Sequence, residues 1–384
     1  MKGSSAMKEE KMRVPFCRHE SSVEAHSNVS DVLDSEEIDQ VVELEREFVS
    51  YVGAEYALAT SHGTSALHLA MLALELKRGD KVVCSVNAHP KVPEVVRHFD
   101  AEPVFIDIDA QSYNINLDKL EAYLEDNRAK KLKAVIVTHI AGQCVDLERL
   151  YRMATIYDVK IVEDAGEALG STYNGKKIGS TGAIITCFNF SSHLKKDVCN
   201  GGMLVSNSQE IIDRAKLLSS HAMVSDEDSL EYIYDVVDIG FDYTMSQLDA
   251  AYIRAQIKEQ DKNLKRVKEI AAMYSKALEL IPHITTPKPL NDEHPYSLYI
   301  IKVDKNRDSF ALELKKNGVD VGVHFIPLHF LSYYKHKYSL KVNNFPVALT
   351  TYQQIMSLPI YPSMKDSEVE YVIEKIKLVA STRV

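Results

Sequence analysis

The chain has 384 residues, more than one compact domain usually contains, so its length predicts two or more hydrophobic cores. Hydrophobic residues make up 45% of the chain and charged residues 26%, which excludes a disordered or collagen-like protein. The net charge of -10 argues against nucleic acid or an anionic membrane as a partner of the whole protein. Every apolar run falls short of the roughly 18 residues that a membrane-spanning helix needs.

The cysteines and the first residues indicate a cytoplasmic protein. The five cysteines form no CxxC pair and are odd in number, so we expect neither a disulfide framework nor a structural zinc site. The segment HESSVEAH at residues 19–26 lacks the HExxH spacing, and we assign no metal. Residues 1–13 are polar and lack the apolar core of a secretory signal, so we interpret them as a disordered arm or an expression remnant.

From residue 56 to residue 206, short apolar segments alternate with amphipathic segments of helical spacing. This repeated alternation predicts a mainly parallel sheet with helices on its faces, whose ligand lies beyond the carboxyl ends of the strands. Strands are predicted at residues 56–60, 81–85, 103–107, 133–139, 160–164, 183–190 and 201–206, and helices at residues 64–75, 93–99, 117–125 and 147–157.

The pattern changes after residue 245. Residues 246–280 are rich in Ala, Lys and Gln and predict one long helix. The chain is therefore predicted to be an α/β protein, with a large domain at residues 14–255 and a smaller C-terminal α+β domain at residues 256–384. In the smaller domain we predict strands at residues 296–303 and 319–325 and helices at residues 308–317, 345–356 and 366–379.

The first candidate site lies where a predicted strand runs into a helix, at Gly63, Thr64 and Ser65. Backbone N–H groups at a helix N-terminus bind phosphate, the two hydroxyl groups add donors, and the glycine allows close approach. Ser and Thr are also common helix caps, so capping explains the same residues about as well.

The second candidate is Asp164, at the carboxyl end of the strand predicted at residues 160–164. A buried carboxylate is unfavourable unless a cation pairs with it, and the protonated nitrogen of a pyridine ring is such a cation. Glu167 can face the same ligand. A lone Asp in this position is more often a helix N-cap, with an acidic residue such as Glu167 in the first turn.

The third candidate is a polar loop after the strand predicted at residues 183–190. It carries Ser191, His193, Lys195 and Lys196. A lysine held beside a phosphate site and a carboxylate is what Schiff-base chemistry with pyridoxal phosphate requires. Adjacent lysines on a loop are more often only solvated, so the order of the three sites along one α/β chain is what favours this chemistry.

Several stretches of this chain follow the sequence pattern of one known family in the same order: EYALATSHGTSALHLAMLAL, AEPVFIDIDAQSYNINLDKLE, VEDAGEALGSTYNGKKIGSTG, GVHFIPLH and MSLPIYP. From about residue 14 to residue 379 the chain resembles the pyridoxal-phosphate sugar aminotransferases of the DegT type, which have the aspartate-aminotransferase fold (fold type I). The resemblance implies a homodimer with active sites at the subunit interface. It also implies amino transfer from glutamate to a nucleotide-linked keto sugar, as in surface polysaccharide or glycan sugar biosynthesis, with pyridoxamine phosphate as the half-reaction form of the cofactor.

The resemblance also implies roles for single residues. Residues 63–65 would hold the cofactor phosphate, Asp164 the pyridine nitrogen and Glu167 the hydroxyl side of the ring. His89 stands where the family has an aromatic residue over the ring, and an imidazole can still stack there. We count Ser191 of the polar loop among the cofactor-binding residues.

Residues nearer the C-terminus would contact the substrate. His324 and His329 match positions that face the sugar nucleotide in the family. The segment GFDYTM places Asp242 and Thr244 where the family has an Asn that helps to bind phosphate from the neighbouring subunit, followed by an Arg. Because a carboxylate repels phosphate, we do not assign Asp242 as a phosphate ligand.

The position of the cofactor lysine depends on the loop register. Counting without gaps places Leu194 at the family's lysine, and leucine cannot form an imine. The pattern S-x-H-x-x-K selects Lys196 and needs a shift of two residues, whereas Lys195 needs a shift of one. A loop absorbs such a shift more easily than a strand does, and we favour Lys195 over Lys196.

Two other functions are compatible with the same residues. A pyridoxamine-phosphate-dependent dehydratase of nucleotide sugars has a histidine in place of the lysine, and His193 would then be the candidate base. A catalytically degenerate member, kept as a binding or regulatory protein, would explain the departures at residues 89, 194, 242 and 244.

Overall fold

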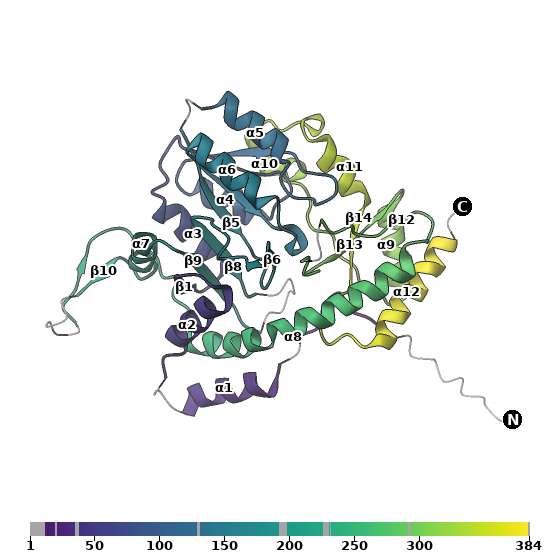
Figure 1. Ribbon diagram of the computed structural model, residues 1–384, viewed down its shortest axis with the longest axis horizontal. Coiled ribbons are helices and arrows are strands. Elements are labelled where there is room, and N and C mark those ends of the chain that lie inside the picture. The colour runs from purple at the N-terminus through teal and green to yellow at the C-terminus, as the bar shows by residue number, and fades with distance from the viewer. Residues whose placement is uncertain are drawn as a thin grey trace.

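The computed structural model describes residues 12–19, 21–34, 38–128, 131–191, 198–225, 230, 232–290 and 293–382. Within them, a seven-stranded sheet has the order β1-β9-β8-β5-β4-β2-β3 (Figure 1). Strand β9 runs antiparallel to both its neighbours, and the other pairs are parallel, which confirms the predicted mainly parallel sheet. The strands are β1 (Tyr56–Thr60), β2 (Lys81–Ser85), β3 (Glu102–Ile106), β4 (Leu132–Thr138), β5 (Lys160–Asp164), β8 (Ile185–Asn189) and β9 (Gly202–Ser206).

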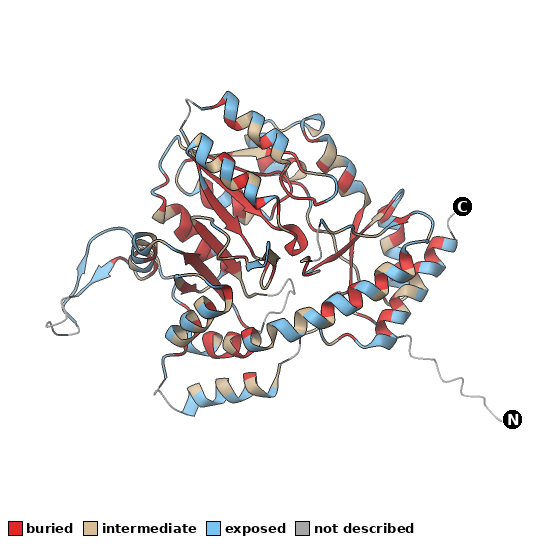
Figure 2. Cartoon of the chain, viewed as in Figure 1, coloured by how far each residue is buried: buried red, intermediate tan, exposed pale blue. Residues whose placement is uncertain are grey.

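Helices cover both faces of this sheet, and the strands are buried between them (Figure 2). Successive side chains of a strand point to opposite faces, so Ala134 and Ile136 of β4 join one core while Val135 and Val137 join the other. The helices of the first core include α3 (Gly63–Ala73), α4 (Lys91–Arg97) and α7 (Gln209–Ser219), and those of the second include α2 (Gln40–Val52), α5 (Leu117–Asp126) and α6 (Leu147–Tyr157).

The longest helix, α8 (Gln247–Leu278), connects the two parts of the chain (Figure 1). Ser246 begins it, because its hydroxyl group accepts the backbone N–H of Asp249 at 3.1 Å. Its first half packs on α2 and on α1 (Val23–Asp34), and its second half on α12 (Asp366–Ser381). The domain boundary that we predicted at residue 256 falls inside this continuous helix.

A third core lies in the C-terminal part, where α8, α9 (Arg307–Lys316) and α12 pack on a small antiparallel sheet. Its strands are β12 (Ile284–Thr285), β13 (Tyr299–Val303) and β14 (Ile355–Leu358). Buried Tyr274 of α8 ties this core together, because its hydroxyl group donates to the carbonyl oxygen of Pro359 at 2.9 Å.

One predicted element of this part is wrong, and another is shorter than predicted. Residues 319–325 form no strand, since the structure gives these described residues only single-residue bridges, Val14 with Val319 and Gly322 with Ser357. The helix predicted at residues 345–356 ends earlier, as α11 (Pro346–Gln354), and Ile355 begins β14.

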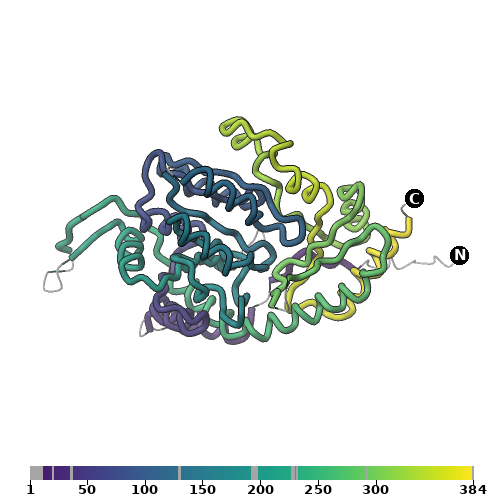
Figure 3. The backbone as a smooth tube through the Cα atoms, turned by 45° about the horizontal axis from the view of Figure 1, so that its top comes forward, coloured from purple at the N-terminus to yellow at the C-terminus, as the bar shows by residue number. Residues whose placement is uncertain are grey.

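The remaining elements are short, and one pair forms an arm. Strands β10 (Met223–Val224) and β11 (Asp235–Val236) pair antiparallel and project from the body of the molecule (Figure 3). In the part of the chain that the structure describes, every helix is too short or too polar to cross a lipid bilayer. The other short elements are β6 (Thr172–Tyr173), β7 (Lys176–Lys177), α10 (Ser332–Lys337) and the 3₁₀ turns Ile140–Gly142, Leu328–Phe330 and Val342–Asn344.

Candidate active site

Three polar side chains stand at the carboxyl ends of neighbouring strands. Thr138 ends β4, Asp164 ends β5 and Asn189 ends β8. The carboxyl ends of parallel strands meet at one edge of a sheet, which is where open α/β sheets bind their ligands. The N-terminus of α3 reaches the same edge, because an added Cβ atom on Gly63 would lie only 2.6 Å from Cβ of Asn189.

The start of α3 is free of the capping that we considered as an alternative. His62 is the N-cap residue, and in the described part of the chain its side chain makes no capping hydrogen bond to the first turn. Thr64 and Ser65 lie inside the helix. The Ser65 hydroxyl group instead pairs with the hydroxyl group of Ser61 at 3.1 Å. The backbone N–H groups of this turn form the positive end of the helix dipole. They lie near the strand ends, an arrangement that suits an anion.

Gly202 allows the start of α3 to lie close against the sheet. A Cβ atom at this position would lie 2.5 Å from the carbonyl carbon of His62 and 2.6 Å from the backbone nitrogen of Gly63. Only glycine allows this close approach of β9 to the helix start.

Asp164 is a buried carboxylate with its own cation. The Lys91 ammonium lies 2.8 Å from Oδ1 of Asp164, and the Thr138 hydroxyl group lies 3.3 Å from Oδ2. The helix-cap interpretation of Asp164 is wrong, because residues 165–171, all of which the structure describes, form turns and begin no helix. The Asp164 carboxylate is thus oriented by residues of two other segments, α4 and β4.

Glu167 is buried beside Asp164. Its Oε2 accepts the backbone N–H of Ala141 at 2.6 Å. Burial, and then the nearby charge of Asp164, raises the pKa of Glu167 to about 7, although the Ala141 hydrogen bond and the Lys91 charge act in the opposite direction. This carboxyl group can therefore hold or release a proton near neutral pH.

His89 is exposed and lies two residues before Lys91. Its Nδ1 accepts the backbone N–H of Lys91 at 3.2 Å, and its ring meets Phe325 edge to face with centroids 5.9 Å apart. Partial desolvation by the surrounding residues, and then the Lys91 charge, lowers the pKa of His89. The lowered pKa favours the neutral imidazole at pH 7. A neutral, exposed ring is available for stacking.

The other predicted residues lie around this centre. The Ser191 hydroxyl group donates to Oδ1 of Asn200 at 3.3 Å, and Ser191 O accepts from Nδ2 of Asn189 at 3.0 Å. Nδ1 of His324 lies 2.9 Å from Oγ of Ser357 in a hydrogen bond, with the ring stacked on Phe16. These contacts leave the predicted ligand roles of Ser191 and His324 as predictions.

His329 is fully enclosed. Its exposed fraction is 0%, and its ring stacks on Phe345 with centroids 5.2 Å apart. Among the described residues, neither of its ring nitrogens has a hydrogen-bond partner, and desolvation lowers the pKa of His329. The side chain offers no surface to a ligand in this arrangement, so its substrate role stays a prediction.

The candidate bases of the polar loop, His193, Lys195 and Lys196, lie outside the described residues. Asp242 and Thr244 are described and exposed, and the Thr244 hydroxyl group donates to Oδ1 of Asp242 at 2.9 Å. Within the described ranges, no group of three or more His, Cys, Asp or Glu side chains is placed to hold a metal ion.

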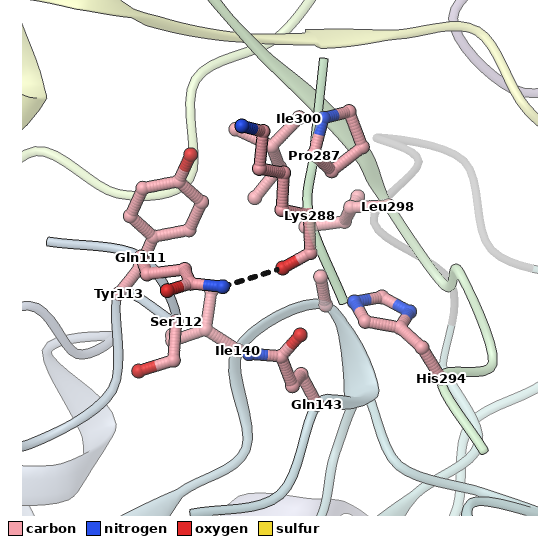
Figure 4. A pocket seen from close by; sticks show the side chains of 11 residues that line it. Gln111, Ser112, Tyr113, Ile140, Gln143, Pro287, Lys288, His294, Leu298 and Ile300 are labelled. Atoms are coloured by element: carbon pink, nitrogen blue, oxygen red, sulfur yellow. Dashed lines mark hydrogen bonds between the residues drawn. The ribbon is translucent and has the colours of Figure 1, made fainter. Parts of the chain in front are cut away.

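A small cavity lies beside the turn that holds Glu167 (Figure 4). The turn residues Ile140 and Gln143 line one side, and Lys288 and His294 line the other. Nε2 of Gln111 closes it by donating to the Lys288 carbonyl oxygen at 3.2 Å. The cavity measures about 10 Å³, room for no more than a water molecule, so it is not a site for a sugar.

Comparison with known proteins identifies the family of this chain. The model of the DegT/DnrJ/EryC1/StrS aminotransferase family matches residues 20–377. The chain belongs to this family. Its membership confirms the resemblance inferred from the sequence and the fold class that the resemblance implied.

The names of several relatives of this chain refer to polysaccharides or sugars. The spore coat polysaccharide biosynthesis protein SpsC of Bacillus subtilis is 34% identical over 350 residues, which covers 88% of this chain and 89% of SpsC. The UDP-4-amino-4-deoxy-L-arabinose--oxoglutarate aminotransferase of Shewanella sediminis is 30% identical over 391 residues and covers 96% of this chain and 99% of its own. The PLP-form structure of Spr1654 from Streptococcus pneumoniae, described as a sugar aminotransferase, is 26% identical, with a TM-score of 0.87, and covers 96% of this chain and 99% of its own.

Sequence reasoning missed three residues of this aminotransferase-family site: Lys91, Thr138 and Asn189. Thr138 and Asn189 are polar residues at or near the carboxyl ends of predicted strands, so the rule that located Asp164 could have located them as well. Lys91 had no such signal, because it begins a short helix and lysines are usually solvated.

Proposed function

We propose that this chain is a pyridoxal-phosphate-dependent aminotransferase that moves an amino group from glutamate to a nucleotide-linked keto sugar, in the biosynthesis of surface polysaccharides or glycans. The single observation that carries the proposal is the buried Asp164 carboxylate at the edge of the sheet where α3 presents its N-terminus. Family membership, a relative in polysaccharide biosynthesis and a sugar aminotransferase relative that uses oxoglutarate support the substrate class.

The residues of the site fit this cofactor. The first turn of α3 offers backbone donors to a phosphate, and Gly63 and Gly202 keep that turn close to the strand ends. Asp164 offers a negative charge to the proton of the ring nitrogen, and Thr138 orients this carboxylate. Glu167 lies within electrostatic reach of Asp164, and the family resemblance assigns it to the ring hydroxyl group. The PLP-form and PMP-form structures of Spr1654 support the same cofactor in both of its forms.

In the proposed reaction, pyridoxal phosphate supplies an electron-withdrawing ring and carries the amino group between donor and acceptor. Asp164 keeps the ring nitrogen protonated, and the start of α3 binds the phosphate. His89 would pack against the face of the ring, and its lowered pKa favours the neutral imidazole, which would add no charge there. Lys195, or else Lys196, takes up and returns the proton at the reacting carbon.

The test has two parts. Purified protein is incubated with pyridoxal phosphate, reduced with borohydride and digested, and the labelled peptide is identified by mass spectrometry. We expect the label on Lys195, with Lys196 as the alternative. Label on neither lysine would contradict the assignment and favour the dehydratase with His193 as its base.

The second part measures turnover. The protein is given glutamate and a panel of nucleotide-linked keto sugars, and 2-oxoglutarate and amino sugar are quantified. We expect both products in equal amounts with at least one sugar. Release of water from the sugar without loss of glutamate would contradict amino transfer.

We also propose that the protein acts as a homodimer. Large apolar side chains in and beside the β10–β11 arm are exposed in the single chain, and a second copy would cover them. Ile239, with an exposed fraction of 78%, is a suitable probe. Sedimentation is expected to show a dimer for the wild type and a monomer for Ile239→Lys, whereas a stable, active wild-type monomer would contradict the proposal. The exposed residues are Met223, Val224, Leu230, Tyr232, Ile233, Tyr234, Val236, Val237 and Ile239.

We propose a cytoplasmic location, because the five cysteines are odd in number and form no CxxC pair, as is usual for proteins of a reducing compartment.

A further inference from the structure

Lys91 is placed in the centre of the candidate site by the start of α4. Its Nζ lies 2.8 Å from Oδ1 of Asp164, and the exposed fractions of the two side chains are only 15% and 4%. The chain around Lys91 leaves room for this approach, since a Cβ atom added to Gly166 would lie 3.3 Å from the Lys91 Nζ. Lys91 is thus a built part of the site rather than a solvated surface lysine.

The ion pair gives Asp164 a complete set of partners. One carboxylate oxygen accepts from the Lys91 ammonium and the other from the Thr138 hydroxyl group. A buried carboxylate requires such compensation, because removing it from water is strongly unfavourable without a nearby cation. The cofactor-free site is therefore already neutralised by a residue of the chain itself.

This arrangement affects the proposed binding of the cofactor, on which the inference rests. The protonated nitrogen of a pyridine ring needs an oxygen of Asp164 and carries the same charge as Lys91. Two cations at one carboxylate repel each other, and each weakens the other's hold. We propose that Lys91 is a built-in counter-ion of Asp164 that competes with the pyridine nitrogen of the cofactor, so that the ammonium must give up its contact when the cofactor binds.

The displaced ammonium has a second carboxyl group nearby. The charge of Lys91 acts on Glu167 as well as on Asp164, and Glu167 is buried on the same side of the sheet edge. In this proposal Lys91 acts on the cofactor through the Asp164 carboxylate, and we therefore call it a positioning residue.

The test is a titration of the cofactor-free protein with pyridoxamine phosphate, in which binding is monitored through the fluorescence of pyridoxamine phosphate. This form carries an amine instead of an aldehyde and cannot link covalently to any lysine, so its affinity reports non-covalent binding alone. Lys91→Met is expected to bind pyridoxamine phosphate about tenfold more tightly than the wild type or better, since one nearby charge commonly shifts a titration equilibrium by one to three pKa units. Lys91→Arg keeps the cation and is expected to bind like the wild type.

A matched control removes the same charge elsewhere. Lys119 pairs with Asp107, a buried carboxylate at the end of β3, at 2.7 Å. Lys119→Met and Lys91→Met are both expected to lower the melting temperature of the cofactor-free protein, but only Lys91→Met should raise the affinity. If Lys91→Met does not fold, Lys91→Gln, which keeps a hydrogen-bond donor without the charge, is measured in its place.

The outcomes separate the inference from the proposed function. Tighter binding by the uncharged variants of Lys91, with wild-type binding by Lys91→Arg and Lys119→Met, supports competition. Equal or weaker binding by the uncharged variants overturns it, while the proposed function stands. No binding of pyridoxamine phosphate or pyridoxal phosphate by any of these proteins overturns both.

Discussion

The protonation of Glu167 gives the cofactor-free protein a distinctive dependence on pH. The ordinary pKa of this carboxyl group is 4.5, and in the folded chain it is raised to about 7, chiefly by burial. Each pKa unit corresponds to about 1.4 kcal/mol, so ionising Glu167 in the folded rather than the unfolded chain is less favourable by roughly 3 kcal/mol. Between these two pKa values the unfolded chain loses its proton and the folded chain keeps it. Stability therefore falls as the pH rises from 4.5 to 7.

The variant Glu167→Gln removes this dependence, because the amide has no proton to lose while its oxygen can still accept the Ala141 N–H. Urea unfolding of wild type and variant is measured at pH 5 and pH 8, without cofactor. We expect the wild type to lose roughly 2.5 kcal/mol more than Glu167→Gln between these values, somewhat less than the full effect because pH 5 already lies above the ordinary pKa. Taking the difference between the two proteins cancels all other titrating groups.

A control of opposite sign is provided by Glu368. Arg18 bonds to its carboxylate at 2.6 Å and lowers the pKa of Glu368, so this contribution is lost as the pH falls. The difference in stability between the wild type and Glu368→Gln should shrink on acidification. Parallel stability curves for the wild type and Glu167→Gln from pH 5 to pH 8 would refute the reasoning, because they would mean that Glu167 ionises in the folded chain as easily as in the unfolded chain.

Two further variants test the roles of Asp164 and Gly202 in the candidate site. Asp164→Asn should reduce amino transfer about a hundredfold or more while the circular dichroism spectrum stays that of the wild type, because the amide cannot hold the ring proton by charge; near-normal turnover would show that the carboxylate is only structural. Gly202→Ala should lower stability by about 1–3 kcal/mol and weaken cofactor binding, since its methyl group meets the backbone of His62 and Gly63 at 2.5–2.6 Å. Calorimetry and cofactor titration measure both effects, and an unchanged melting temperature would contradict the close approach.

The strands of the large sheet could be predicted because their burial on both faces leaves a direct trace in the sequence. Segments such as KIVED at residues 160–164 are short apolar runs between polar turns, and β5 has these bounds. The strand predicted at residues 319–325 failed because alternation alone does not supply a partner strand. Buried Val319 follows the pattern, yet only single residues of this segment pair. No glycine or proline interrupts the helical pattern just before Ile355, so no local sequence signal predicts the start of β14.

The site could be predicted where a position in the fold determines the chemistry. Asp164 and the start of α3 lie at strand ends, and a parallel sheet brings its strand ends together whatever the details of the loops. Lys91 could not be predicted in this way, because the direction of a long, flexible side chain depends on packing that no local pattern records. The same holds for His329, whose complete burial against Phe345 is a property of how two distant segments meet.

The ion pair of Lys91 with Asp164 also bears on how strongly the fold depends on its cofactor. A bare buried carboxylate would destabilise the empty site by several kcal/mol, and a cationic ligand would then stabilise the protein by relieving that strain. Here Lys91 relieves it already, at 2.8 Å. In the proposed site, cofactor binding would exchange one cation for another at Asp164, so the net gain for this carboxylate would be small. The affinity for the cofactor would then come mainly from its phosphate, which we propose to lie at the start of α3, and from a covalent link to Lys195 or Lys196. An empty site that is stable by itself is the physical consequence of placing a lysine at residue 91.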